Sequence, residues 1–296
     1  MCQHTPKINM PARRNAPNSM HELNLSIGGG IWTALQQQSQ RTGESLDHII
    51  RHAISESLDL DHHTIHQVST SGALVKGVYQ GCVNISEVKR YGDFGLGTFD
   101  ALDGEGIMLD GICWQACGDG RVLVAPDDAL APFWTTTFFK ADRSITLNQV
   151  NSWDDLIQIL DQERISENIF YAIRVRGIFK SIQYRVACKA EAGADLVEAT
   201  NHQAEFHAQS IAGTLVGFWT PAYARTINVP GYHLHLLSDD RQHAGHVLDV
   251  AAEELTVEIH QETELQVVLP ETSDFLQADL NGDPAEALAK AEGKHS

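Results

Sequence analysis

The stretch Pro230-Gly-Tyr-His-Leu-His-Leu-Leu-Ser-Asp-Asp-Arg-Gln-His-Ala-Gly-His-Val-Leu248 contains an alternating segment, a polar segment and a second apolar segment. This order is typical of a β-hairpin with a polar loop. Residues i and i+2 of a strand share a face, so His233 and His235 are expected side by side, with His246 of the returning strand opposite them. His243 lies in the loop and is the alternative third histidine, but the apolar residues after His246 favour His246.

Three imidazoles that leave one position open are a ligand set of catalytic zinc. Copper, iron and nickel also accept imidazole, so the pattern predicts a metal site more firmly than it predicts which metal. The chain contains 15 histidines. A chance pair of surface histidines is therefore the alternative interpretation.

Strand signals dominate the chain from about residue 68. They occur in short apolar or alternating runs, such as 121–125, 171–175, 213–219 and 255–259. Only three later stretches favour helices, at 68–77, 152–164 and 284–292. Because strands do not alternate regularly with helices, the pattern predicts an α+β fold on mixed β-sheets rather than a doubly wound parallel sheet.

The N-terminal part differs from the rest of the chain in its composition and in its pattern of apolar residues. Residues 1–20 contain three prolines and no apolar periodicity, which indicates a flexible tail. Residues 21–62 predict a small strand-helix-helix segment, because Leu23, Leu25 and Ile27 alternate before two helical stretches. This segment resembles a ribbon–helix–helix unit, in which two chains pair their strands and the ribbon enters DNA.

Charge argues against DNA as the partner of this segment. The exposed strand positions would be Glu22, Asn24 and Ser26, none of which is a cation, and the whole chain has a formal net charge of −18. The phosphate-neutralising contribution to DNA affinity is therefore weak. We expect residues 21–62 to pair with a second copy, giving a homodimer or a larger assembly, since so short a unit buries little core alone.

Other classes are excluded by composition. No apolar run approaches the length of about 18 residues that a membrane-spanning helix needs, and the first residues lack the apolar region of a secretory signal. The five cysteines are scattered and odd in number. These features predict a cytoplasmic protein with reduced thiols that does not associate with membranes.

A family resemblance is carried by five stretches in order along the chain: Gly92–Glu105, Asn168–Arg174, Gly213–Pro221, Val229–Arg241 and Gly245–Asp249. They resemble the motifs of bacterial α-acetolactate decarboxylase over about residues 67–296. The resemblance implies a catalytic domain of two β-sheet lobes with a metal between them, and non-oxidative loss of CO2 from 2-acetolactate to give acetoin.

The resemblance also implies the site residues. Zinc would be held by His233, His235 and His246, and the site would be completed by Glu105, Arg185 and Glu292. Two nearby arginines, Arg174 and Arg176, are alternatives to Arg185. Glu105 as a turn residue, Arg185 as a sheet ion pair and Glu292 as a frayed terminus are the non-catalytic interpretations.

The chemistry of the reaction requires these residue types, independently of the resemblance. Loss of CO2 leaves an electron pair beside a ketone, which a Lewis acid can accept. A guanidinium can orient the departing carboxylate, and carboxylates can carry protons. Two alternatives stay open: another three-histidine zinc enzyme, such as a hydrolase or isomerase, and a DNA-binding regulator whose decarboxylase-like core senses a ligand.

Overall fold

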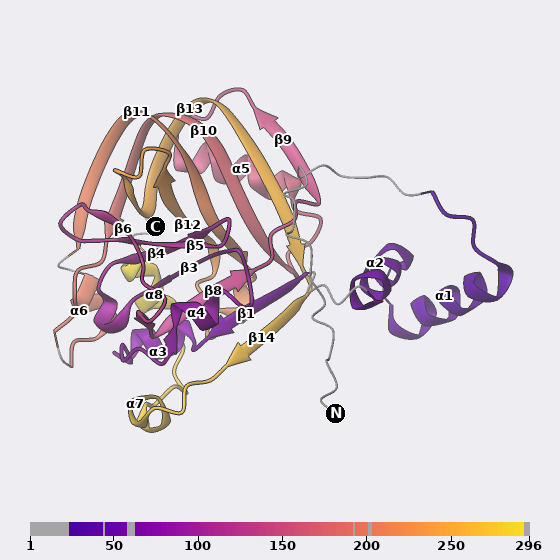
Figure 1. Cartoon of the computed structure of the whole chain (residues 1–296), viewed down its shortest axis with the longest axis horizontal. Helices are drawn as coiled ribbons and strands as arrows, with labels where there is room; N and C mark the ends of the chain where they lie inside the picture. Colours follow the sequence, from indigo (N-terminus) through magenta and orange to yellow (C-terminus); the bar gives the residue numbers. More distant parts are fainter. Residues whose placement is uncertain (1–23, 44, 58–62, 192, 201–202, 293–296) are drawn as a thin grey trace, which may run out of the picture.

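The computed structural model describes residues 24–43, 45–57, 63–191, 193–200 and 203–292, so the predicted flexible tail of residues 1–20 lies outside the described residues. Strands dominate the described chain and the helices of the catalytic part are short, which confirms the predicted α+β class (Figure 1). Two large mixed or antiparallel sheets form the body of the molecule.

The larger sheet has seven strands. Its order is β14 (Glu264–Val268), β1 (Thr64–Val68), β8 (Phe133–Thr137), β3 (Phe94–Thr98), β4 (Glu105–Leu109), β5 (Ile112–Ala116) and β6 (Val122–Val124). Only the β1–β14 pair is parallel; the other neighbours are antiparallel. A separate short pair joins β2 (Val83–Asn84) to β7 (Leu130–Ala131).

The second sheet has five longer strands. Its order is β10 (Phe170–Val186), β11 (Ala204–Thr220), β12 (Gly231–Ser238), β13 (Ala244–Glu262) and β9 (Arg143–Leu147). Strand β13 pairs with β12 at its start and with β10 along most of its length. Because β10 also pairs with β11, and β11 with β12, these four strands close on themselves. Figure 1 shows the long strands β10, β11 and β13 curving over the seven-stranded sheet.

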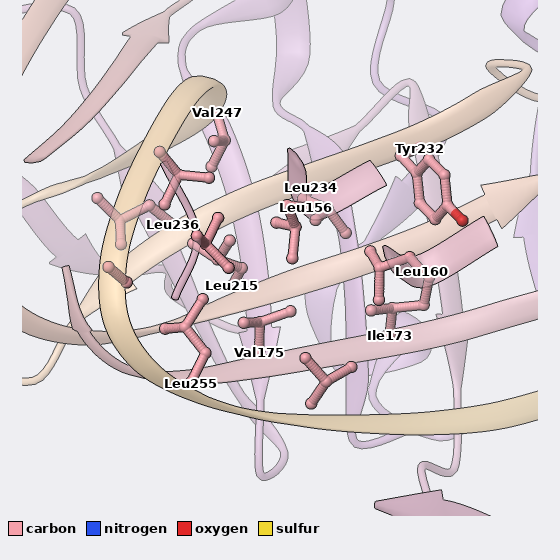
Figure 2. Close-up of a cluster of buried hydrophobic side chains, with 14 of the residues drawn as sticks. Leu156, Leu160, Ile173, Val175, Leu215, Tyr232, Leu234, Leu236, Val247 and Leu255 are labelled. Atoms are coloured by element: carbon pink, nitrogen blue, oxygen red, sulfur yellow. The ribbon is translucent and has the colours of Figure 1, made fainter. Parts of the chain in front are cut away.

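A hydrophobic core fills one face of the five-stranded sheet. Helix α5 (Trp153–Glu163) begins after Ser152, whose side chain accepts a hydrogen bond from the Asp155 amide. The helix buries Leu156 and Leu160 against the sheet. Figure 2 shows both leucines beside strand residues, among them Leu234, Leu236 and Val175.

The opposite face of β12 points to the seven-stranded sheet. Leu237 belongs to a second core, together with Val216 of β11 and Leu96 and Ile107 of the seven-stranded sheet. Side chains of β12 therefore alternate between two cores, as the period of a strand requires. This alternation sends His233 and His235 toward the space between the two sheets.

The three helices predicted beyond residue 67 are present. They are α3 (Ser71–Val75), α5 and α8 (Ala285–Ala291). Three more helices were not predicted: α4 (Ile85–Val88), α6 (Leu196–Thr200) and α7 (Ser273–Gln277). The 3₁₀ turns at Asp100–Leu102 and Ala222–Ala224 were also missed. All are too short to show a 3.6-residue period.

Strand β1 begins at Thr64, three residues before the predicted start of the catalytic domain at residue 67. Ile65 is completely buried in this strand. In the N-terminal part, α1 (Gly29–Thr42) and α2 (Leu46–Ser57) are the two predicted helices. The strand predicted within residues 21–27 is not confirmed, because residues 24–28 have no regular secondary structure and residues 21–23 lie outside the described chain.

Two side-chain contacts join α2 to the sheets. The Arg51 Nη1 lies 3.1 Å from the Asp142 Oδ1, and the His52 Nε2 lies 3.1 Å from the Glu264 Oε1. Helix α1 buries none of its residues. In the described residues, no helix is both long and apolar enough to cross a membrane. Four cysteines of the described chain are free thiols: Cys82, Cys113, Cys117 and Cys188.

Candidate active site

The predicted hairpin is formed by β12 and β13. His235 is the cross-strand partner of His246, and His233 lies two residues before His235 on the same strand face. One ring nitrogen from each of the three histidines lies within 4.8 Å of the others. His243 does not join them, because its Nδ1 lies 2.9 Å from the Tyr184 hydroxyl.

Gly217 of β11 allows the histidine strand β12 to lie close to β11. A Cβ on Gly217 of β11 would lie 2.8 Å from the Leu234 Cα and still nearer to the His233 carbonyl oxygen. Only a residue without a side chain permits β11 to approach the histidine strand this closely.

The histidine geometry fits a metal ion. Two nitrogens bound at about 2.05 Å to one tetrahedral zinc lie about 3.3 Å apart. The His233 and His235 Nε2 atoms lie 3.1 Å apart. The His235 Nδ1 donates to the Gly106 carbonyl at 3.0 Å, which leaves Nε2 with its lone pair. Burial lowers the pKa of His235 to about 4, so this imidazole is neutral near neutral pH, as a metal ligand must be.

The Gly-rich stretch places the seven-stranded sheet against this histidine. Gly97 of β3 pairs with Gly106 of β4, and the Trp134 ring lies where a Cβ on either glycine would be. Gly97 lies in a strand rather than at the start of a helix. The close packing of Trp134 brings the Gly106 carbonyl to His235.

Glu105 is the first residue of β4 and points to the histidines. Its Oε2 lies 3.6 Å from the His235 Nε2, and its Oε1 accepts a hydrogen bond from the Ala187 amide at 3.1 Å. Burial raises the pKa of Glu105 to about 7, although the Ala187 amide and the charge of Arg185 oppose this rise. Glu105 is thus a buried carboxyl within the site and not an exposed turn residue.

Arg185 and Glu292 reach the same cluster from two other elements. Arg185 of β10 is the cross-strand partner of His246 in β13. Its Nη2 lies 3.7 Å from the Glu292 Oε2, which in turn lies 3.4 Å from the His246 Nε2. Glu292 caps α8, whose Leu288 and Ala291 are buried, and its side chain is only 13% exposed. The described position of Glu292 is therefore anchored rather than frayed.

The other two arginines of β10 lie elsewhere. Arg174 donates to Glu258 at 2.8 Å and its guanidinium lies over the Phe139 ring. Arg176 donates to the same carboxylate. Of the three arginines, Arg185 alone lines the histidine cavity.

The cavity between the sheets has a volume of about 80 Å³ and contains all six predicted site residues. Further wall residues come from several segments, and sequence reasoning did not assign them to the site: Leu74, Leu102, Phe133, Leu196, Thr200, Gln203, Val229 and Leu288. Most of them are apolar.

Comparisons with known proteins identify the family of this chain. The sequence profile described as alpha-acetolactate decarboxylase matches residues 65–282. The alpha-acetolactate decarboxylase of Methanosarcina mazei is 37% identical over 250 residues, covering 84% of this chain and 85% of that protein. The Bacillus subtilis alpha-acetolactate decarboxylase is 40% identical over 231 residues, covering 77% of this chain and 91% of its own.

A solved structure supports the same relationship. The crystal structure of the alpha-acetolactate decarboxylase from Bacillus subtilis strain 168 superposes with a TM-score of 0.76 at 39% identity, covering 78% of this chain and all of that one. The fold and these relatives define an enzyme of the carboxy-lyase class. The chain belongs to the α-acetolactate decarboxylase family.

Proposed function

We propose that this protein converts 2-acetolactate to acetoin and CO2 and that it uses a zinc ion held by His233, His235 and His246. One observation carries the proposal: two carboxylates and a buried arginine converge with the three histidines in a single cavity. The names of the relatives supply the substrate.

The metal would supply a Lewis acid that accepts electron density from the ketone and hydroxyl oxygens of the substrate. Its ligands are neutral imidazoles, so the ion keeps its full positive charge. That charge is needed locally, because the formal net charge of the chain is −18 and repels an organic anion.

Arg185 binds and orients the substrate carboxylate. Its guanidinium is buried on the same sheet face as His246 and can form two parallel hydrogen bonds to a carboxylate. Holding the carboxylate in one orientation favours cleavage of the bond to CO2, and the electron pair of that bond passes toward the neighbouring carbonyl.

Glu105 and Glu292 carry protons. They approach the histidine cluster from opposite elements, β4 and α8, and each lies within 4 Å of one histidine nitrogen. One carboxylate takes the hydroxyl proton of the substrate and returns it to an oxygen of the product. The other carboxyl group, protonated from solvent, adds one proton to carbon, which balances the loss of CO2 from the substrate anion and completes acetoin. Glu105 lies 3.6 Å from the His235 Nε2, and Glu292 lies 3.4 Å from the His246 Nε2.

The test is an assay of CO2 and acetoin release from racemic 2-acetolactate by purified protein, before and after chelation and zinc restoration. We expect activity to follow the zinc held by the three histidines, and His235→Ala to lose both that zinc and the activity. Full zinc retention in His235→Ala would refute the ligand set. Ester hydrolysis or isomerisation without CO2 release would favour the other three-histidine enzyme class.

Residues 21–62 are proposed to pair with a second copy of the chain. Leu25, Ile31 and Trp32 are each at least 45% exposed in the single chain, and α1 buries no residue against the sheets. Pairing would remove this apolar surface from water.

Removing the N-terminal segment tests the pairing. The truncated chain should begin at His63, because Ile65 of β1 is buried in the core. We expect zinc content and acetoin formation to persist and light scattering to show a smaller assembly. The full-length double variant Ile31→Asp, Trp32→Asp should show the same smaller assembly. An unchanged assembly in both would contradict pairing, and salt-resistant binding of specific DNA by residues 1–62 would favour the regulator.

A further inference from the structure

A second cluster of potential metal ligands lies away from the proposed active site. His63 directly precedes β1, Asp142 directly precedes β9, and His260 lies near the end of β13. One ligand atom from each of these residues lies within 4.8 Å of the other two. Their side chains are 9%, 9% and 0% exposed, so three separate chain segments bring polar groups together in the interior.

Backbone groups hold the side chains of this cluster in place. The His63 Nδ1 donates to the Gln261 carbonyl, and the Lys140 amide donates to the His260 Nδ1 at 3.5 Å. The Asp142 Oδ2 accepts a hydrogen bond from the Gln261 amide at 2.8 Å, and the Oδ1 contacts Arg51. Backbone carbonyls that fix the tautomer of a histidine, and donors that hold a carboxylate, are the usual outer partners of metal ligands.

A fourth group, Glu262, contacts one member of the cluster. It lies two residues after His260 on β13, and its Oε1 is 3.3 Å from the His260 Nδ1. The carboxyl group is completely buried, and among the described residues no hydrogen bond of good geometry reaches either oxygen. A carboxylate buried in this way needs a nearby positive charge in order to be ionised, and a bound cation would supply it.

We propose that His63, Asp142, His260 and Glu262 form a second metal site, for a divalent transition-metal ion of the zinc type. Two neutral imidazoles and two carboxylates neutralise such an ion, and imidazole with carboxylate is a donor set that zinc accepts. All four donors come from the protein, which is the pattern of a structural ion rather than a catalytic one.

The position of the site explains what the ion would do. Strand β1 belongs to the seven-stranded sheet, whereas β9 and β13 belong to the five-stranded sheet. The ion would therefore tie the two sheets together at an edge away from the active site. Because Arg51 of α2 contacts Asp142, it would also stiffen the attachment of the N-terminal helices. The inference goes beyond the proposed function and does not depend on it.

Metal counting in the full-length chain tests the proposal. Wild-type protein is saturated with Zn²⁺ and freed of loosely bound metal, and its zinc content per chain is measured by elemental mass spectrometry. We expect two zinc ions per chain in wild type and one in His260→Gln. His235→Gln, which removes a ligand of the first cluster, should retain one. The matched control His207→Gln changes an exposed histidine of β11 and should retain two.

Cobalt gives a second readout that does not depend on catalysis. The His235→Gln variant loaded with one Co²⁺ should show visible absorption bands, and adding Glu262→Gln should weaken Co²⁺ binding at least tenfold while keeping the buried volume. One zinc in wild type together with none in His235→Gln would overturn the proposal and leave a metal-free network of buried side chains. One zinc in wild type and none in His260→Gln would instead support the second site and contradict the first.

Discussion

Replacing Arg185 and Arg174 with alanine, one at a time, should separate catalysis from stability. The two arginines lie on the same strand and are both nearly completely buried. Arg185 lies in the histidine cavity beside Glu292, whereas Arg174 bonds to Glu258 and stacks over Phe139. Their side chains are chemically identical, so any difference between the variants must come from location.

The structure sets the expected magnitudes. Loss of a positioning group lowers turnover by about 100-fold, which is about 2.7 kcal/mol of activation free energy. The turnover of Arg185→Ala should therefore be lower than that of wild type by about this factor. Removing one partner of a buried ion pair costs about 3–5 kcal/mol. Since Arg176 still contacts Glu258, we take about 3 kcal/mol for Arg174→Ala, which corresponds to a melting temperature about 6–12 °C lower in a domain of this size.

The assay combines acetoin release under saturating substrate, zinc content and thermal melting followed by circular dichroism. Arg185→Ala should keep its zinc and most of its melting temperature, and Arg174→Ala should keep most of its turnover at a temperature well below its own melting point. A 100-fold loss of turnover in Arg174→Ala, with at least half of the activity retained in Arg185→Ala, would refute the assignment of Arg185.

Three further changes test separate parts of the structure. Glu105→Gln should lower turnover by about 100-fold while zinc content and melting temperature stay near those of wild type, because the amide keeps the volume but cannot carry the proton; unchanged turnover would exclude Glu105 as a proton carrier. Gly217→Ala should lower zinc affinity and stability together, since its Cβ would lie 2.8 Å from the Leu234 Cα and nearer still to the His233 carbonyl, and Gly193→Ala in an open turn is the control for zinc affinity. Burial alone would raise the pKa of Glu258, but hydrogen bonds from Arg174 and Arg176 outweigh it and hold that pKa below 4.5. The ionised Glu258 therefore stabilises the folded state above about pH 4.5, and this contribution is lost as the pH falls through the folded pKa. The melting temperature of wild type should therefore fall more steeply with acid than that of Glu258→Gln, and parallel curves would contradict this.

The histidine hairpin was predictable because its information is local. The period of two in β12 and the polar loop after it place His233, His235 and His246 on one face without knowledge of the remaining fold. His243 is excluded by its contact with Tyr184, which lies on β10 and has no sequence signal.

The choice of arginine was not predictable from local pattern. Arg174, Arg176 and Arg185 all lie on β10, and counting alternate residues does not give their faces, because the pairing of β10 with β13 shifts register near Gly177, Phe179 and Gln183. Each bulge changes which side chains share a face. Only the family resemblance indicated Arg185.

Two other features depend on contacts that no local sequence pattern contains. The cluster of His63, Asp142 and His260 combines three segments that lie far apart in the chain. The predicted N-terminal strand has no described partner strand within one chain, and a strand needs a partner to satisfy its backbone hydrogen bonds. A period of alternating residues can therefore predict the strand without deciding whether a single chain forms it.

The pairing of β13 with both β12 and β10 has a consequence for the order in which the site assembles during folding. His246 meets His235 across a short turn, and closing a short loop has a small entropic cost. Arg185 lies beside the same histidine only once β10 has paired with β13, which joins residues far apart in the chain and is a slower, non-local step. We therefore expect the histidine hairpin to form early and the arginine to arrive late. A folding chain would then acquire affinity for metal before it acquires the ability to turn over substrate.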